Sequence, residues 1–427
     1  MKKFVFASLL ALASTTLCAA PFALAQDTTG QVTIKDPAEY NAYTNAVGQS
    51  DPKAKAGAIE SFLTSYPQSV VKADMLEQLM AAYQAGGDLN KTVDAAGRLL
   101  QIDPNNLRAL ALTVYIKKAQ AAQAQASQNA AGAQTLLDDA AALAQRGLTA
   151  QKPAAMSAAD FDKLKKATTP IFHSAIAADD VAKKDFKGAV TEYHSELESV
   201  TPEQTTSGPS LNDTYLMGSA YVQMDPKDLL NGIWYLARAA GYAPEPAKTQ
   251  LDAQAKYWYN RYHGGTDGYE AIQALAKTSV FPTADYKIAP APSPQDVVAK
   301  IVAETPDLKT LALSDKEFIL SNGKKEDADK LWGQLKDVTA KIPGVVIAAT
   351  SSQIQLAVSE DAKTSKVADF TVNMKAPVTN PPAVGANVDL TATFDSYTAS
   401  PAMIVLKDGE LPAPAKKPAT HAPVRRK

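Results

Sequence analysis

The sequence predicts a mainly α-helical protein in which helix pairs repeat along the chain and a small β-rich domain follows. Three observations predict this class. Apolar residues recur at helical spacing, in paired runs, up to about residue 282. The proline-rich stretch "TADYKIAPAPSP" at 283–294, which is predicted to be a linker, then interrupts this pattern. Beyond it apolar and polar residues come to alternate, as they do in strands.

The first 25 residues have the features of an export signal. Two lysines precede an apolar run, and "ALA" at 23–25 has the small-residue spacing of a cleavage site. We expect cleavage after Ala25 and export to the periplasm or cell envelope. Two alternatives remain: an uncleaved membrane anchor, since the run is nearly long enough to span a bilayer, and a lipoprotein modified at Cys18, which the bulky Leu17 disfavours.

Charge divides the chain into an acidic body and a short basic tail. The whole chain carries a net charge of −2, which becomes −4 without the two signal lysines and −9 without the five cations of the tail at 411–427. An acidic body argues against nucleic acid as a partner, because phosphate binding needs basic surface. The tail, "LPAPAKKPATHAPVRRK", is predicted to be unstructured. It is either a solubilising segment or a weak tether to an anionic envelope surface.

The stretch "MLEQLMAAYQAGGDLNKTVDAAGRLLQIDPNN" at 75–106 defines the repeating unit. It reads as helix, glycine turn, helix and proline stop. When the unit begins at Ala73, its key positions are Leu76, Leu79, Met80 and Tyr83 in the first helix, Gly87-Asp88 in the turn, Thr92, Ala96 and Leu99 in the second helix, and Pro104 after it. This skeleton resembles the 34-residue tetratricopeptide repeat (TPR), although Met80 and Thr92 replace the small residues that the family prefers.

Similar patterns recur at 58–69, 184–202, 215–244 and 256–282, so we predict four or five repeats over residues 36–282. The alanine- and glutamine-rich segment 107–153 is the least regular. It is either one repeat with long helices and a widened turn near 129–132, or a low-complexity helix outside the stack.

The TPR resemblance implies stacked helix pairs whose first helices line a concave, protein-binding groove. It therefore implies a non-catalytic scaffold or adaptor with a protein partner, which the sequence does not identify. Carried onto this chain, the groove positions are Asp74, Glu77 and Gln84 in the first of three sets, Asn212, Tyr215 and Ser219 in the second, and Lys256, Asn260 and His263 in the third.

The region 295–410 is predicted to begin with helices at 295–304 and 324–341 and to continue with about five strands. The order of these strands resembles an oligonucleotide/oligosaccharide-binding (OB) barrel; a β-sandwich or a few strands packed on helices is the alternative. Phe370 and Phe394 are expected in its core and Tyr397 on a loop. A second functional hypothesis follows, in which the barrel binds a glycan, lipid or oligonucleotide and the repeats support it.

The sequence predicts no catalytic residues, no metal and no cofactor. Its four histidines, His173, His194, His263 and His421, lack metal-ligand spacing. The glycine pairs at 86–87 and 264–265 lack a phosphate-loop pattern and are read as turns. No G-x-S-x-G motif is present. The carboxylate pairs at 138–139 and 179–180 are expected to face solvent, and the aromatic run "YWYNRYH" at 257–263 is expected to pack in a helical seam.

Overall fold

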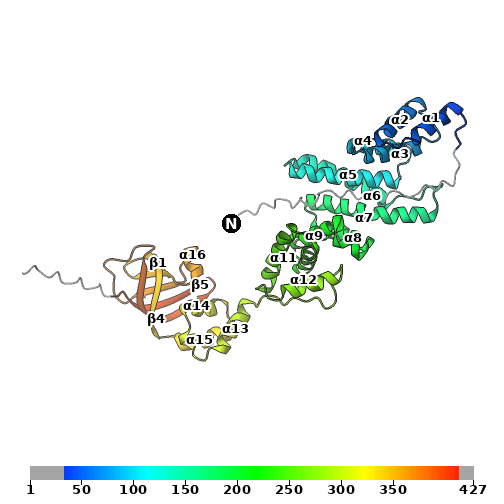
Figure 1. Cartoon of the computed structure of the whole chain (residues 1–427). Coiled ribbons are helices and arrows are strands. Elements are labelled where there is room, and N and C mark those ends of the chain that lie inside the picture. Colours follow the sequence, from blue (N-terminus) through cyan, green and yellow to red (C-terminus); the bar gives the residue numbers. More distant parts are fainter. Residues whose placement is uncertain (1–32, 413–427) are drawn as a thin grey trace, which may run out of the picture. The chain divides into compact units, whose positions relative to one another are not determined.

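The computed structural model describes residues 33–412, which divide after Pro290 into two compact units. The described part of the first unit is built from helices, and the second combines helices with a closed five-stranded β-barrel (Figure 1). The predicted class, mainly α with a small C-terminal barrel, is confirmed. The predicted signal peptide with its cleavage site after Ala25 lies outside the described residues, as does the tail beyond residue 412. Within residues 33–412, no helix is both long enough and apolar enough to cross a membrane.

Twelve α-helices of the first unit follow one another as six consecutive pairs within the described residues. The pairs are α1 (Pro37–Val47) and α2 (Pro52–Ser65), α3 (Lys72–Ala85) and α4 (Leu89–Ile102), α5 (Leu107–Ala126) and α6 (Ala130–Leu148), α7 (Ala158–Lys183) and α8 (Phe186–Ser199), α9 (Gly208–Gln223) and α10 (Leu229–Tyr242), and α11 (Ala247–His263) and α12 (Tyr269–Thr278). A 3-10 helix, η1 (Pro202–Thr206), lies between the fourth and fifth pairs.

The pair α3–α4 has the helix boundaries and the core that the 75–106 stretch predicts. Six of the predicted positions are at most 5% exposed: Leu76, Leu79, Met80, Thr92, Ala96 and Leu99. Gly87 makes the turn with a φ of +76°, a conformation that glycine adopts without steric cost. The Asp88 side chain then accepts a hydrogen bond from the Lys91 amide and so caps the start of α4.

The segment 107–153 forms a regular helix pair that belongs to the stack. Its helices α5 and α6 pack between α4 and α7. The connecting turn lies at 127–129, slightly before the predicted position, because Asn129 caps α6 by accepting from the Gly132 amide at 3.0 Å. The alternative of an isolated low-complexity helix is therefore wrong.

The proline-rich stretch predicted as a linker has no helix or strand before α13 begins at Pro294. Its first half packs on the helical unit. The Tyr286 ring lies 4.8 Å from that of Trp234, its hydroxyl donates to the Leu230 carbonyl, and Ile288 is buried.

Two glycines let α9 and α10 approach each other closely. A Cβ atom on Gly218 would lie 2.8 Å from the backbone nitrogen of Leu236, and one on Gly232 would lie 2.4 Å from Cγ1 of Val222. Backbone atoms cannot move aside as a side chain can. The spacing of Gly218 and Gly232 in the sequence therefore reflects a real steric requirement at this helix crossing.

Gly218→Ala is expected to lower the free energy of unfolding by about 1–3 kcal/mol, the usual range for overpacking a filled core. Gly97→Ala is the matched control, because Gly97 lies in the exposed interior of α4 with no atom within 4 Å of the added Cβ. That change is expected to stabilise the protein by about 0.5–1 kcal/mol, since glycine weakens a helix interior. Urea unfolding of both variants checks the pair, and shifts of the same sign would contradict the assignment.

The second unit begins with three helices: α13 (Pro294–Glu304), α14 (Leu313–Asn322) and α15 (Lys325–Leu335), with a 3-10 turn, η2 (Leu308–Thr310), after the first. The helix predicted for 324–341 is wrong beyond Leu335, and α14 was not predicted. Asp337 adopts a φ of +62°, which ends the helical path. Thr339 and Ala340 then pair with β4 as strand residues.

Five strands close into a barrel in the order β1-β2-β3-β5-β4, so that β4 returns to β1. They are β1 (Thr339–Ala349), β2 (Gln353–Ala357), β3 (Phe370–Met374), β4 (Asn387–Ala399) and β5 (Ala402–Glu410), with a short helix, α16 (Glu360–Ser365), between β2 and β3. All neighbouring strands are antiparallel except β3 and β5, which run parallel.

Side chains fill the barrel interior. Phe370 is 0% exposed and Phe394 is 1% exposed, as predicted for core residues. The prediction that Tyr397 lies on a loop is wrong. Tyr397 lies on β4, where its half-buried ring is 4.9 Å from that of Trp332 on α15. A ligand of this barrel would therefore contact its outer surface or loops.

Candidate functional site

Polar side chains connect the first helix of one pair to the first helix of the next along the helical unit; we call these contacts the inter-helix row. Glu77 on α3 accepts hydrogen bonds from Arg108 of α5 at 3.2 Å and from Asn106, which caps α5, at 2.7 Å. The Tyr215 hydroxyl on α9 donates to Gln254 on α11 at 3.0 Å. These contacts join α3 to α5 and α9 to α11.

The first end of this row joins α1 to α3. Asp74 on α3 is hydrogen-bonded by Gln78, and together with burial it raises the pKa of Tyr43 on α1. Burial is the larger cause of that shift, and the Asp74 carboxylate adds to it by charge and hydrogen bonding.

The nine residues predicted for the groove lie on α3, α9 and α11, at spacings that place each set of three on one helix face. Asp74, Glu77 and Tyr215 belong to the inter-helix row, and Gln84 and Asn212 are half-buried. Ser219 is 9% exposed, and its hydroxyl has no hydrogen-bond partner within residues 33–412.

The set on α11 differs in its contacts. Lys256 bridges Asp252 at 3.0 Å and Glu270 at 3.5 Å, while Asn260 is exposed. Nδ1 of His263 lies 2.8 Å from the Ala289 carbonyl. Only Tyr215 links two of the helices that carry these sets, so the nine residues do not gather into one cluster. Their role in partner binding stays a prediction.

A buried polar cluster extends the row across α5, α7 and α9. Ser174 of α7 receives a hydrogen bond from Lys118 of α5 and donates one to Asp213 of α9. Nζ of Lys118 also lies 3.4 Å from Oδ1 of Asp213, whose side chain is 1% exposed. A buried carboxylate requires such compensation, because ionised groups lose most of their hydration in a protein interior.

A second carboxylate lies beside this cluster. Glu196 of α8 is 2% exposed; its Oε1 accepts from Ser210 at 2.6 Å, and its Oε2 has no partner among the described residues. Burial, followed by the nearby charge of Asp213, raises the pKa of Glu196 to about 8. Glu196 is therefore mostly protonated at neutral pH, which leaves one carboxylate to balance Lys118.

The prediction that the carboxylates at 179–180 face solvent is wrong. Asp179 is 5% exposed and binds Lys183 at 2.7 Å and Gln134 at 2.9 Å. Asp180 is half-buried, and burial, followed by the charges of Asp185, Glu192 and Asp179, raises its pKa to about 6. The other predicted pair behaves as expected, since Asp138 and Asp139 are exposed.

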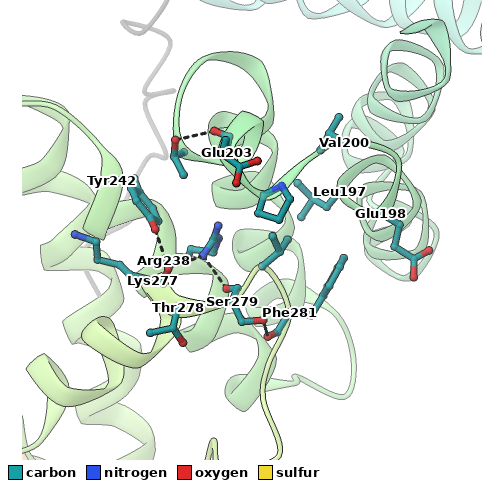
Figure 2. A pocket seen from close by; sticks show the side chains of 13 residues that line it. Leu197, Glu198, Val200, Glu203, Arg238, Tyr242, Lys277, Thr278, Ser279 and Phe281 are labelled. Carbon is teal, nitrogen blue, oxygen red and sulfur yellow. Dashed lines mark hydrogen bonds between the residues drawn. The ribbon is translucent and has the colours of Figure 1, made fainter. Parts of the chain in front are cut away.

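Three of the second helices, α8, α10 and α12, surround a hollow of about 670 Å³ together with η1. Arg238 and Tyr242 of α10 and Lys277 of α12 lie on one side of it, and Glu198 of α8 and Phe281 lie on the other (Figure 2). The Arg238 side chain is 2% exposed.

Arg238 binds the C-terminal end of α12. Its Nη1 donates to the carbonyls of Ala276 at 2.8 Å and Ser279 at 2.7 Å, and its Nη2 donates to the Thr205 hydroxyl at 2.7 Å. Helix C-termini carry unpaired carbonyls and partial negative charge, which favours a cation there. Nε of Arg238 nevertheless has no partner among the described residues. Such an unpaired buried N–H costs about 1–3 kcal/mol.

Two histidines and the aromatic run at 257–263 make contacts within the fold. His173 lies 2.7 Å from Glu192 and His194 lies 3.5 Å from Glu198. No group of three metal-binding side chains occurs within residues 33–412. In the aromatic run 257–263, Tyr259 is 3% exposed and packs in the core, as predicted.

The chain matches no protein-family model, and no curated protein matches it significantly.

Proposed function

We propose that this protein is an exported, non-catalytic scaffold or adaptor of the tetratricopeptide-repeat kind, acting in the periplasm or cell envelope. Its helical unit binds a protein partner through the first helices of the pairs. The inter-helix row is the observation that carries this proposal.

Neighbouring first helices build a continuous surface, and solenoids of stacked helix pairs use such extended surfaces to bind other proteins. Contacts such as Glu77–Arg108 and Tyr215–Gln254 hold successive first helices together along that surface. The burial of Leu76, Ala96 and Leu99 supports the TPR register, because these are the positions where the family packs one helix of a pair against the other.

Affinity capture from solubilised cell envelope tests the proposal. We expect residues 26–427 and the helical unit alone, residues 26–290, to retain the same set of proteins. The double variant Gln84→Arg/Asn260→Arg, which places two cations on α3 and α11, is expected to lose that set.

The double variant Gln101→Arg/Gln145→Arg is the matched control. It adds the same charge at exposed positions of the second helices α4 and α6, and it should retain the proteins. Loss of binding in both double variants would point to a charge effect rather than to the first helices. A protein set retained only by the barrel unit would overturn the proposal.

The barrel supports a second candidate function, in which it binds a glycan, lipid or oligonucleotide. Its closed strand order 1-2-3-5-4 with parallel β3 and β5 is favourable to the OB interpretation. A small hollow of about 360 Å³ lies between β1, the start of β4, α14 and α16, and its lining includes Pro343, Lys363 and Asp389. Glycan and lipid arrays probed with residues 291–427 test this candidate.

A further inference from the structure

We propose that Glu196 is a pH-sensitive latch between the fourth and fifth helix pairs. While Glu196 carries a proton, the contact between α8 and α9 stays closed, and loss of the proton opens this contact locally. The latch goes beyond the proposed function and does not depend on it, because it rests only on the buried groups between these helices.

The hydrogen bonds of Glu196 are the first part of the argument. Its side chain is 2% exposed and lies on α8, which packs against α9. Oε1 accepts from the Ser210 hydroxyl of α9 at 2.6 Å, whereas Oε2 has no partner within residues 33–412. An ionised carboxylate only accepts hydrogen bonds, and a buried charge without partners is costly. The closed contact therefore suits the protonated form of Glu196 better than the ionised form.

The charges around Glu196 favour the same form. Asp213 of α9 is a second carboxylate, whose side chain is 1% exposed and accepts from Ser174. Nζ of Lys118 lies 3.4 Å from Oδ1 of Asp213. Among the described residues, Asp213 and Lys118 are the charges that act on Glu196. If Glu196 ionised in the closed state, two buried carboxylates would share one cation, and their repulsion would oppose the ionisation.

A buried tyrosine on the same helix does not change this balance. Tyr193 precedes Glu196 by about one helical turn, and its hydroxyl has no partner among the described residues either. Burial, followed by the charges of Asp213, Glu196 and Asp180, raises the pKa of Tyr193 well above its ordinary value. The hydroxyl therefore keeps its proton at neutral pH and adds no charge beside Glu196.

The other ionisable groups on the neighbouring elements are engaged or exposed elsewhere. His173 of α7 pairs with Glu192, and Arg238 of α10 donates to carbonyls at the end of α12. Glu198 of α8 has a side chain that is 60% exposed, and Glu203 of η1 is exposed as well. None of these groups supplies a partner for the free oxygen of the latch.

The architecture of the helical unit makes the opening local. Each described helix pair packs mainly on the next one, and such a stack can open at one contact while the others persist. Burial, followed by the charge of Asp213, raises the pKa of Glu196 to about 8, whereas an ordinary glutamate has a value of 4.5. An open contact hydrates the carboxylate and restores the ordinary value. Opening is therefore favoured by about tenfold per pH unit between these two values and levels off above them.

Hydrogen exchange followed by mass spectrometry tests the latch in residues 26–427 between pH 6 and 8. After correction for the base-catalysed exchange of free amides, protection of the segment 186–223 should fall about tenfold per pH unit. Protection of α3 and α4 should stay constant, because they belong to the second pair. Equal losses in both regions would mean that Glu196 acts only through unfolding of the whole unit, which would overturn the proposal.

Two matched variants assign the effect to Glu196. Glu196→Gln keeps the shape of the protonated side chain and removes its titration, so protection of the segment 186–223 should become independent of pH. Glu198→Gln makes the same change on the same helix at an exposed side chain, and it should behave like the unaltered protein. A pH-dependent loss that persists in Glu196→Gln, or that disappears in Glu198→Gln, would refute the latch.

A direct titration completes the test. In protein labelled with ¹³C at the glutamate side-chain carboxyl, comparison with Glu196→Gln identifies the Glu196 resonance. That resonance should titrate with a midpoint near pH 8. A midpoint near pH 4.5 would show that the closed contact holds the ionised form, and the proposal would then be wrong.

Discussion

Replacing Asp213 with alanine should lower the free energy of unfolding of the helical unit by about 3 kcal/mol. The change leaves Lys118 and Ser174 without their shared acceptor, and removing one partner of a buried ion pair typically costs 3–5 kcal/mol. We expect the lower end of that range, because the Lys118 side chain is 27% exposed and can recover part of its hydration. Urea unfolding followed by circular dichroism measures the effect.

Asp139→Ala provides a closely matched control. Asp139 pairs at 2.8 Å with Lys117, the residue next to Lys118, but its side chain is 55% exposed. Exposed ion pairs contribute at most about 1 kcal/mol, so this variant should be nearly as stable as the unaltered protein. Equal effects of the two substitutions would refute the buried cluster as a stabilising element.

Replacing Glu196 with glutamine should change how stability depends on pH. The folded-state pKa of Glu196, about 8, lies above the ordinary glutamate value of 4.5, so folding favours the protonated form. Its contribution is complete below pH 4.5 and is lost as pH rises towards 8. The unaltered protein should therefore lose roughly 3 kcal/mol over this window, and Glu196→Gln should remove most of that loss.

The pH dependence of stability that comes from Glu196 can be separated from that of Asp180. Its pKa is raised only to about 6, so its own contribution is lost at lower pH than that of Glu196. Unfolding measured between pH 6.5 and 8 thus reports mainly on Glu196. Asp180→Asn should leave the slope in that range unchanged, whereas a slope that survives Glu196→Gln would contradict the assignment.

Local helix pairing could be predicted from the sequence because its determinants lie close together in the chain. Leu76, Leu79, Ala96 and Leu99 fall at helical spacing, and all are buried where the repeat pattern places them. Gly87 marks the turn because few other residues adopt its conformation.

The charged clusters could not be predicted in this way. Lys118, Ser174 and Asp213 come from three helices, and nothing local in the sequence specifies that they meet. A weaker signal existed for Glu196, which follows the buried Tyr193 by three residues and therefore lies on an apolar helix face. The same reasoning applied to Asp179 would have corrected the expectation that it faces solvent.

The strands of the barrel could be predicted from the sequence, but their pairing could not. Alternation identified the strands and the inward positions of Phe370 and Phe394, because that signal has a period of two residues. Alternation does not specify which strands are neighbours. The pairing of β1 with β4 joins residues about 50 positions apart, and only the folded chain reveals it.

Closure of the barrel also restricts how anything could attach to it. Each of the five strands has a neighbour on both sides, so the backbone N–H and C=O groups along the strands are largely engaged within the sheet. Peptides that dock by adding a strand need an open sheet edge with unpaired backbone groups. Recognition by the barrel must therefore rely on side chains and connecting loops. The same closure protects the protein from edge-to-edge aggregation between copies of its sheet.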